Sequence, residues 1–315
     1  MSERDSEQHD ADLRAVGAAY LEHLTADDQR LLVRVAARSP EGTGALHRSP
    51  ALVPQLLADA PVLDEVLGTP PGEGPAGAPA PVTPELVSPF LVFAAAVERS
   101  HAQLGRATYV REWFGPRQRV PVLGATDLQA FLADPWHRLF LAELLGSYVR
   151  VASGAVVVKT RRGLRRQRFS ELDPVRMAAL LDVTPEPERP GIYRRLGDLA
   201  LFLTGVFPDH TARHGLAPIE ESRLPRTVPR ASGAASPPPP SPRSPVDPGA
   251  VALFEELGRR WYRLAYEGVP HPRPRAIRLV GDLAGSFSGA RRALNLISDD
   301  YLFPVRDQWF GSPLS

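Results

Sequence analysis

Apolar residues in the N-terminal part of the chain recur three and four positions apart, the spacing that places side chains on one face of an α-helix. The stripe consists of Leu13, Val16, Tyr20, Leu24, Leu31, Leu32 and Val35. A second stretch with helical spacing covers about residues 51–67. The pattern therefore predicts an N-terminal helical region over residues 1–67.

The central segment, residues 85–224, carries the strongest helical patterns. Thr83 followed by Pro84 is typical of a capped helix start, and the apolar run after it, SPFLVFAAAVERSHAQL, predicts a central helix. Thr126 and Gln129 have the spacing of a capping box and predict another helix start, and Asp173 followed by Pro174 predicts a further one. We expect this segment to form the core of a helical domain.

Within residues 154–169 the pattern changes from helical spacing to a run of β-branched residues. The sequence GAVVVKTRRGLRRQRF contains three valines, a central Arg-Gly pair and a second arm that ends in phenylalanine. This arrangement predicts a β-hairpin that turns near Arg162–Gly163.

Two proline-rich stretches divide the chain. Residues 68–84 read GTPPGEGPAGAPAPVTP, and residues 225–250 contain SPPPPSPRSP, which excludes a helix interior or a central strand there. We expect both to be linkers, the second disordered, and the helices of residues 251–315 to pack on the central domain. The predicted fold is mainly α, a compact helical domain with one basic β-hairpin and two Pro-rich linkers.

The composition and the pattern of apolar residues indicate the cellular compartment of the protein. The chain has no cysteine, which removes disulfides, thiolate nucleophiles and cysteine-based metal sites. The first residues, MSERDSEQHDADLR, are polar and acidic where a signal peptide has a basic start and an apolar run. No apolar run approaches the roughly 18 residues of a membrane span. We expect a cytoplasmic protein that does not contact a membrane.

Cofactor motifs do not occur in a usable context, so no cofactor is expected. Residues 72–77, GEGPAG, have the spacing of a dinucleotide-binding loop, but they lie in a Pro-rich linker and not between a strand and a helix. A phosphate-binding loop needs lysine after glycine, and the only lysine, Lys159, follows valine.

The predicted hairpin concentrates positive charge in a chain whose formal net charge is only +1. Its basic residues are Lys159, Arg161, Arg162, Arg165, Arg166 and Arg168. Alternate residues of a strand share one face, so several guanidinium groups could contact a phosphate backbone. One interpretation is a nucleic-acid or other anion-binding surface. The other is a solvated edge hairpin whose charges prevent strand pairing between molecules, or a hairpin whose charges are paired with acidic residues elsewhere in the chain.

A metal site is a weaker candidate. His210 and His214 are four residues apart and, on a helix, could share a metal ion with Asp209. Pro208 is expected to end the preceding helix, however, and the three residues are then polar positions in a loop.

Asp198 is an isolated acid in the apolar run LGDLALFL. Since a buried carboxylate is costly unless it is paired, we expect an ion pair with Arg194 or Arg195. A catalytic role for Asp198 would need a second acid nearby, and the sequence does not identify one.

Several runs of the chain resemble an uncharacterised protein family of high-GC Gram-positive (actinobacterial) bacteria. They are SPFLVFAAAVERS, RLFLAELLGSYVRVASG, RQRFSELDP, YRRLGDLALFLTGVFPDH, LGRRWYRLA and ARRALNLISDDYLFPVRDQWFG. Together they cover most of residues 86–215 and 250–311. The resemblance implies a cytoplasmic bacterial protein with variable Pro-rich linkers. The family has no assigned activity, so the resemblance transfers no catalytic residue.

Three classes of function remain after these observations. Because the residues form no catalytic constellation, the first expectation is a non-enzymatic cytoplasmic interaction or regulatory protein with a protein partner. The second is a nucleic-acid-binding protein that uses the Arg-rich hairpin. The third is an enzyme that uses Asp198, Asp209 or the pair of His210 and His214, in one version with the assistance of a metal ion.

Overall fold

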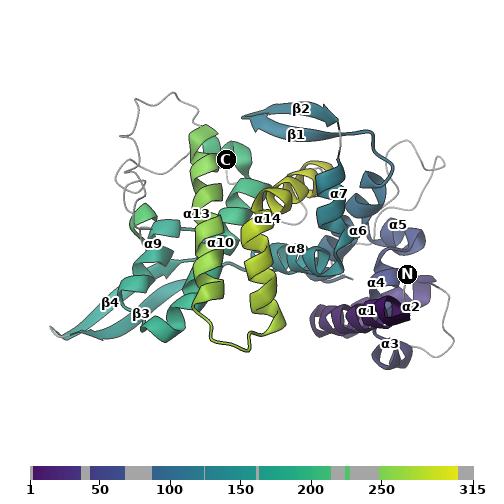
Figure 1. Cartoon of the computed structure of the whole chain (residues 1–315), viewed down its shortest axis with the longest axis horizontal. Helices are drawn as coiled ribbons and strands as arrows, with labels where there is room; N and C mark the ends of the chain where they lie inside the picture. The colour runs from purple at the N-terminus through teal and green to yellow at the C-terminus, as the bar shows by residue number, and fades with distance from the viewer. Residues whose placement is uncertain are drawn as a thin grey trace. The chain divides into compact units, whose positions relative to one another are not determined.

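The chain is mainly α-helical, as the sequence predicted (Figure 1). The structure is a computed structural model that describes residues 3–36, 43–67, 87–123, 125–160, 163–213, 224–227 and 248–303. The chain divides into two compact units. Unit 1 comprises residues 1–110, 123–149 and 296–315, and unit 2 comprises residues 111–122 and 150–295.

Helix α6 (Pro89–Leu104) is the central helix of unit 1. Every residue from Phe90 to Ser100 is buried, as the apolar run predicted. Helix α6 packs against α8 (Pro135–Ser147) and α5 (Ala60–Leu67). The other elements of this unit are α1 (Glu3–His23), α2 (Ala26–Ala36), α3 (Gly44–Arg48), α4 (Leu52–Leu57), α7 (Thr126–Ala133) and the π-helical turn η4 (Ser298–Leu302). The helical stretch predicted over residues 51–67 is therefore two helices, α4 and α5.

A serine cap sets the start of α6. Ser88 Oγ accepts a hydrogen bond from the Leu91 amide at 3.2 Å. Pro89 takes the first helical position, where a missing N–H group costs nothing. The predicted cap, Thr83, lies outside the described residues.

The capping box predicted at the start of α7 was wrong. Thr126 is the first residue of the helix and not its cap, and no side chain caps this end. Gln129 Nε2 donates instead to the Leu104 carbonyl oxygen at 2.8 Å. Since the last carbonyls of a helix lack intrahelical donors, Gln129 satisfies the C-terminus of α6 and not the N-terminus of its own helix.

Helices α10 (Arg189–Val206) and α13 (Pro248–Glu267) pack along each other at the centre of unit 2 (Figure 1). A glycine allows their close approach, because a Cβ at Gly197 would lie 2.4 Å from Tyr262 Cδ1, and that tyrosine is fully buried. The other helical elements are α9 (Pro174–Ala178), η1 (Ala179–Asp182), η2 (Glu186–Glu188), α11 (Pro208–Arg213), η3 (Leu224–Thr227) and α14 (Arg275–Ile297).

The predicted hairpin forms from strands β3 (Ser153–Thr160) and β4 (Gly163–Ser170), which pair antiparallel. Strand β3 ends at Thr160 and β4 begins at Gly163, and Arg161 and Arg162 between them lie outside the described residues.

A second hairpin, β1 (Tyr109–Gly115) and β2 (Gln118–Leu123), was not predicted. Its turn is Pro116–Arg117, and Arg117 has a φ of 60°. Glycine or asparagine usually occupies such a left-handed position. Because an arginine stands there, the sequence lacks the residue that commonly marks this kind of turn.

The predicted linkers lie largely outside the described residues. Residues 68–84 lie wholly outside them, and 225–250 overlap them only at 225–227, in η3, and at 248–250, in α13. None of the described helices combines the length and the apolar character that a bilayer crossing requires.

Candidate functional site

The predicted basic hairpin is a two-stranded ribbon, and in Figure 1 its strands extend beyond α9. Residues directly opposite each other in antiparallel strands share a face. Val157 lies opposite Arg166 in this register. The positions of this face, here called the basic face, are Ala155, Val157, Lys159, Leu164, Arg166 and Arg168. Val157 is 61% exposed, so the basic face is open at its centre.

The root of the ribbon is tied to the helices of unit 2. Glu171 Oε2 accepts a hydrogen bond from the Ala152 amide at 2.9 Å and lies 3.2 Å from Arg195 Nη2. Asp173, the next acid, accepts from the first amides of α9 and caps that helix, in agreement with the Asp-Pro signal in the sequence. The two acids nearest the ribbon in sequence thus act at its root.

Asp209, a candidate metal ligand in the sequence, lies in α11 and contacts the β1–β2 hairpin. Its Oδ1 accepts hydrogen bonds from Trp113 Nε1 at 2.7 Å and from the Arg117 amide at 3.1 Å. Arg119 Nη1 lies 3.4 Å from the same oxygen. The carboxylate therefore holds the hairpin turn in which Arg117 is left-handed.

The metal site predicted at Asp209, His210 and His214 lies partly outside the described residues. The preceding helix ends at Val206, and Pro208 begins helix α11 where a loop was expected. His210 lies in α11, and His214 lies outside the described residues. Within the described ranges, no group of three or more histidine, aspartate or glutamate residues could hold a metal ion.

Asp198 is 7% exposed and is engaged by two side chains. Tyr262 donates its hydroxyl to Oδ1 at 2.8 Å, and Arg194 Nε lies 3.9 Å from Oδ2. The expected ion pair with Arg194 is present but long. The closer contact comes from α13, so only the packing of α13 on α10 could have identified it.

Unit 1 contains a buried charged cluster that the sequence analysis missed. Glu98 in α6 is 1% exposed, and its Oε1 accepts hydrogen bonds from Arg138 Nε at 2.8 Å and Tyr20 OH at 3.5 Å. Arg138 Nη1 also donates to the Leu132 and Ala133 carbonyls at 2.6 and 3.1 Å. Burial raises the pKa of Glu98, and the charge of Arg138 opposes that shift. A lone acid inside the apolar run FAAAVERSH was the signal available in the sequence.

Two histidines beside this cluster have pKa values shifted in opposite directions. His23 Nε2 lies 3.0 Å from Glu143 Oε1, and this hydrogen bond raises the pKa of His23. Burial lowers the pKa of His101, and the positive charge of Arg138 lowers it further.

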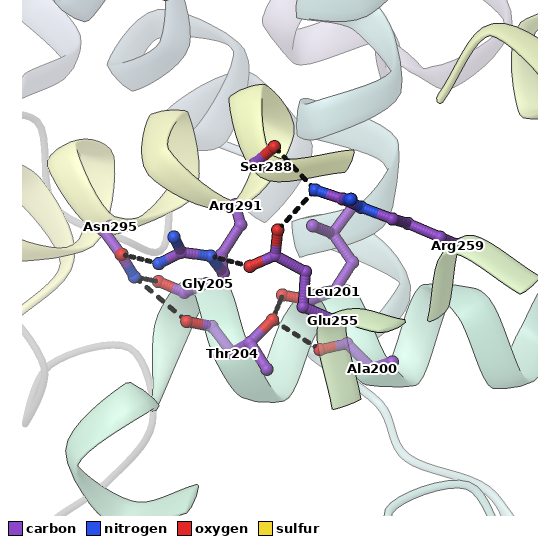
Figure 2. A network of polar contacts seen from close by, with 9 residues as sticks. All are labelled: Ala200, Leu201, Thr204, Gly205, Glu255, Arg259, Ser288, Arg291 and Asn295. Atoms are coloured by element: carbon purple, nitrogen blue, oxygen red, sulfur yellow. Dashed lines mark hydrogen bonds and ion pairs between the residues drawn. The ribbon is translucent and has the colours of Figure 1, made fainter. Parts of the chain in front are cut away.

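Figure 2 shows a second polar network, in unit 2. Glu255 of α13 accepts hydrogen bonds from Arg259 Nη2 at 2.7 Å and Arg291 Nε at 2.8 Å. Arg259 Nη2 also donates to Ser288 Oγ at 2.9 Å. The carboxylate thus joins α13 to α14 through two guanidinium groups.

The same network continues from α14 to α10 (Figure 2). Arg291 Nη1 donates to Asn295 Oδ1 at 3.2 Å. Asn295 Nδ2 donates to the carbonyl oxygens of Thr204 and Gly205 at 3.1 and 2.5 Å. The two donors of Asn295 thus end on backbone carbonyls of α10, and the network joins α14 to α10.

Comparison of this chain with the models of known protein families, with curated proteins and with solved structures finds no match. The function is therefore argued from the residues and their geometry.

Proposed function

We propose that this protein is a non-enzymatic nucleic-acid-binding protein and that the β3–β4 ribbon is its contact surface. The proposal rests on the concentration of positive charge in one segment of the chain. Residues 153–170 contain six basic residues and no acidic one, whereas the whole chain has a net charge of +1, so the remaining residues carry −5. A concentrated basic segment on an otherwise acidic protein is the electrostatic pattern of a phosphate-backbone contact.

The ribbon geometry supports this proposal. Arg166 and Arg168 occupy alternate positions of β4 on the same face as Lys159. Val157, in the centre of that face, is largely exposed. The Glu171 contacts anchor the root to the rest of unit 2, and a surface on an anchored element loses less entropy on binding than one on a free loop.

A non-enzymatic role is supported by what four acids on the helices do. Glu98, Asp198, Asp209 and Glu255 each accept hydrogen bonds from arginine, tyrosine or tryptophan side chains of the fold. These contacts are those of acids that stabilise packed helices and hairpins.

The test is fluorescence anisotropy of a labelled DNA duplex of about 30 base pairs, titrated with the full chain at roughly 50 and 200 mM salt. The ribbon variant carries Arg165→Ser, Arg166→Ser and Arg168→Ser. A control variant carries Arg106→Ser, Arg213→Ser and Arg263→Ser, three exposed positions outside the ribbon, and loses the same charge.

We expect binding that weakens as salt rises, a loss of about tenfold or more at low salt in the ribbon variant, and a much smaller loss in the control. Equal losses in both variants would show that net charge, and not the ribbon, governs binding. Absence of binding by the natural chain to this duplex and to a labelled RNA would overturn the proposal and favour a solvated hairpin or an acidic protein partner.

A further inference from the structure

We infer that the ligand is double-stranded DNA and that the ribbon enters the major groove, with Val157 against base edges and the cations of the basic face against the flanking phosphates. This inference rests on the proposed function and adds the class of nucleic acid and the mode of contact. Three features of the ribbon support it.

The first feature is size. Strand β3 has eight residues, which at about 3.3 Å per residue gives a length of roughly 26 Å. Two strands about 4.8 Å apart, with their side chains, match the roughly 12 Å width of the B-form major groove. The minor groove, at about 6 Å, is too narrow, and the major groove of A-form RNA is too narrow and deep for side chains to read.

The second feature is the exposed valine. Val157 lies opposite Arg166 and is 61% exposed, so its side chain is not used for packing in unit 2. In the major groove, an apolar side chain contacts the 5-methyl group of thymine. RNA lacks this methyl group, so an exposed valine at a central position of the ribbon favours DNA.

The third feature is the distribution of residue types over the strands. Arg165 and Arg166 are consecutive in β4 and so belong to opposite faces of the ribbon. Lys159, Arg166 and Arg168 therefore share the face of Val157, the one that would lie toward the groove, and Arg165 belongs to the opposite face. The ribbon has no aromatic residue before Phe169 at its root, which leaves no platform for stacking the bases of a single strand.

A competition experiment with the full chain tests the class of nucleic acid. A labelled DNA duplex is displaced by unlabelled DNA duplex, RNA duplex of the same sequence or single-stranded DNA of the same length, at one salt concentration. We expect the RNA duplex and the single strand to compete at least about tenfold less well than the DNA duplex. Equal competition by all three would overturn the inference and leave the proposed function standing. No binding of the labelled duplex would overturn the inference, and it would overturn the proposed function as well if a labelled RNA of the same sequence also fails to bind.

A second experiment tests the groove contact. A duplex in which uracil replaces every thymine keeps its charge and base pairing but lacks the 5-methyl groups. We expect the natural chain to bind it several-fold more weakly and Val157→Ser to bind both duplexes equally. Val151→Ser, at a position 41% exposed and outside the ribbon, is the matched control and should keep the preference for thymine. A natural chain that does not distinguish the two duplexes would remove Val157 from the base edges.

Discussion

Arg195 Nη2 lies 3.2 Å from Glu171 Oε2, and this contact joins the root of the β3–β4 ribbon to helix α10. Both side chains are about four-fifths buried. Since an ion pair shielded from solvent contributes more than an exposed one, the contact should restrain the ribbon against local opening.

Loss of this ion pair should loosen the ribbon without unfolding the protein. Glu171→Gln keeps an acceptor for the Ala152 amide but removes the charge that attracts Arg195. We expect several-fold faster cleavage by trypsin between residues 159 and 168 and a loss of about 1 kcal/mol in the free energy of unfolding. Limited digestion with mass spectrometry and urea denaturation measure the two effects. Glu188→Gln, at an exposed position, is the control, and equal cleavage of the two variants would argue against a restraint at the root.

In the buried pair of Glu98 and Arg138, the effect on stability of removing one side chain should depend strongly on the presence of the other. Arg138→Met leaves the Glu98 carboxylate buried without its main partner, which should lower the free energy of unfolding at neutral pH by about 3–5 kcal/mol. Urea denaturation of the natural and variant proteins measures the loss. The double variant Glu98→Gln/Arg138→Met should recover part of it, because it contains no unpaired buried charge.

The loss caused by Arg138→Met should depend on pH. Burial already raises the folded-state pKa of Glu98 above its usual 4.5, and removal of Arg138 raises it further. A raised folded-state pKa gives a stabilisation that is complete below the unfolded pKa and is lost as pH rises through the folded pKa. The variant should therefore be less destabilised near pH 5 than near pH 8. A loss that is the same at both pH values would show that Glu98 does not take up the proton.

The pKa values of His23 and His101 should be shifted in opposite directions in the folded protein. The Glu143 hydrogen bond raises the pKa of His23 above 6.5, so its contribution to stability is complete below 6.5 and is lost as pH rises through the folded value. Burial lowers the pKa of His101, so its contribution is present above 6.5 and is lost as pH falls. NMR titration of the imidazole protons measures both values. Glu143→Gln should lower the pKa of His23 and leave that of His101 nearly unchanged; the reverse result would contradict the assignment.

Two glycines of α10 provide a matched pair for packing. A Cβ at Gly197 would lie 2.4 Å from Tyr262, whereas a Cβ at Gly191 would meet no atom within 4 Å. Gly197→Ala should cost about 1–3 kcal/mol, because the tyrosine ring must move away from Asp198. Gly191→Ala should be neutral or stabilise the protein by up to about 1 kcal/mol through helix propensity. Urea denaturation of both variants checks the difference, and similar values would argue against close packing of α10 on α13.

The sequence predicted those elements whose signals are local. The run of buried residues in α6, the Asp173 cap of α9 and the valine-rich arm of the β3–β4 hairpin each arise within a few neighbouring residues. The β1–β2 hairpin was missed because Arg117 occupies a left-handed position that glycine or asparagine usually marks. The capping box failed because Gln129 has a better partner 25 residues away, at the end of α6.

The candidate sites also differ in whether their residues lie close together in the sequence. The basic residues of the ribbon were visible as a run of charge, because they are adjacent in the chain. Arg194 was visible as a partner of Asp198 because it lies one helical turn away, whereas the closer partners of the buried acids were not, since Tyr262 is 64 residues from Asp198 and Arg138 is 40 residues from Glu98. Such contacts are set by helix packing, which a single sequence does not show.

The amide of Asn295 binds the Thr204 and Gly205 carbonyls, which belong to the last turn of α10. A helix end that is capped by a residue of another helix cannot fray alone, because the capping side chain must first move away. The end of α10 and the C-terminal half of α14 should therefore form one cooperative opening unit, with backbone amides that exchange hydrogen with solvent at matched rates.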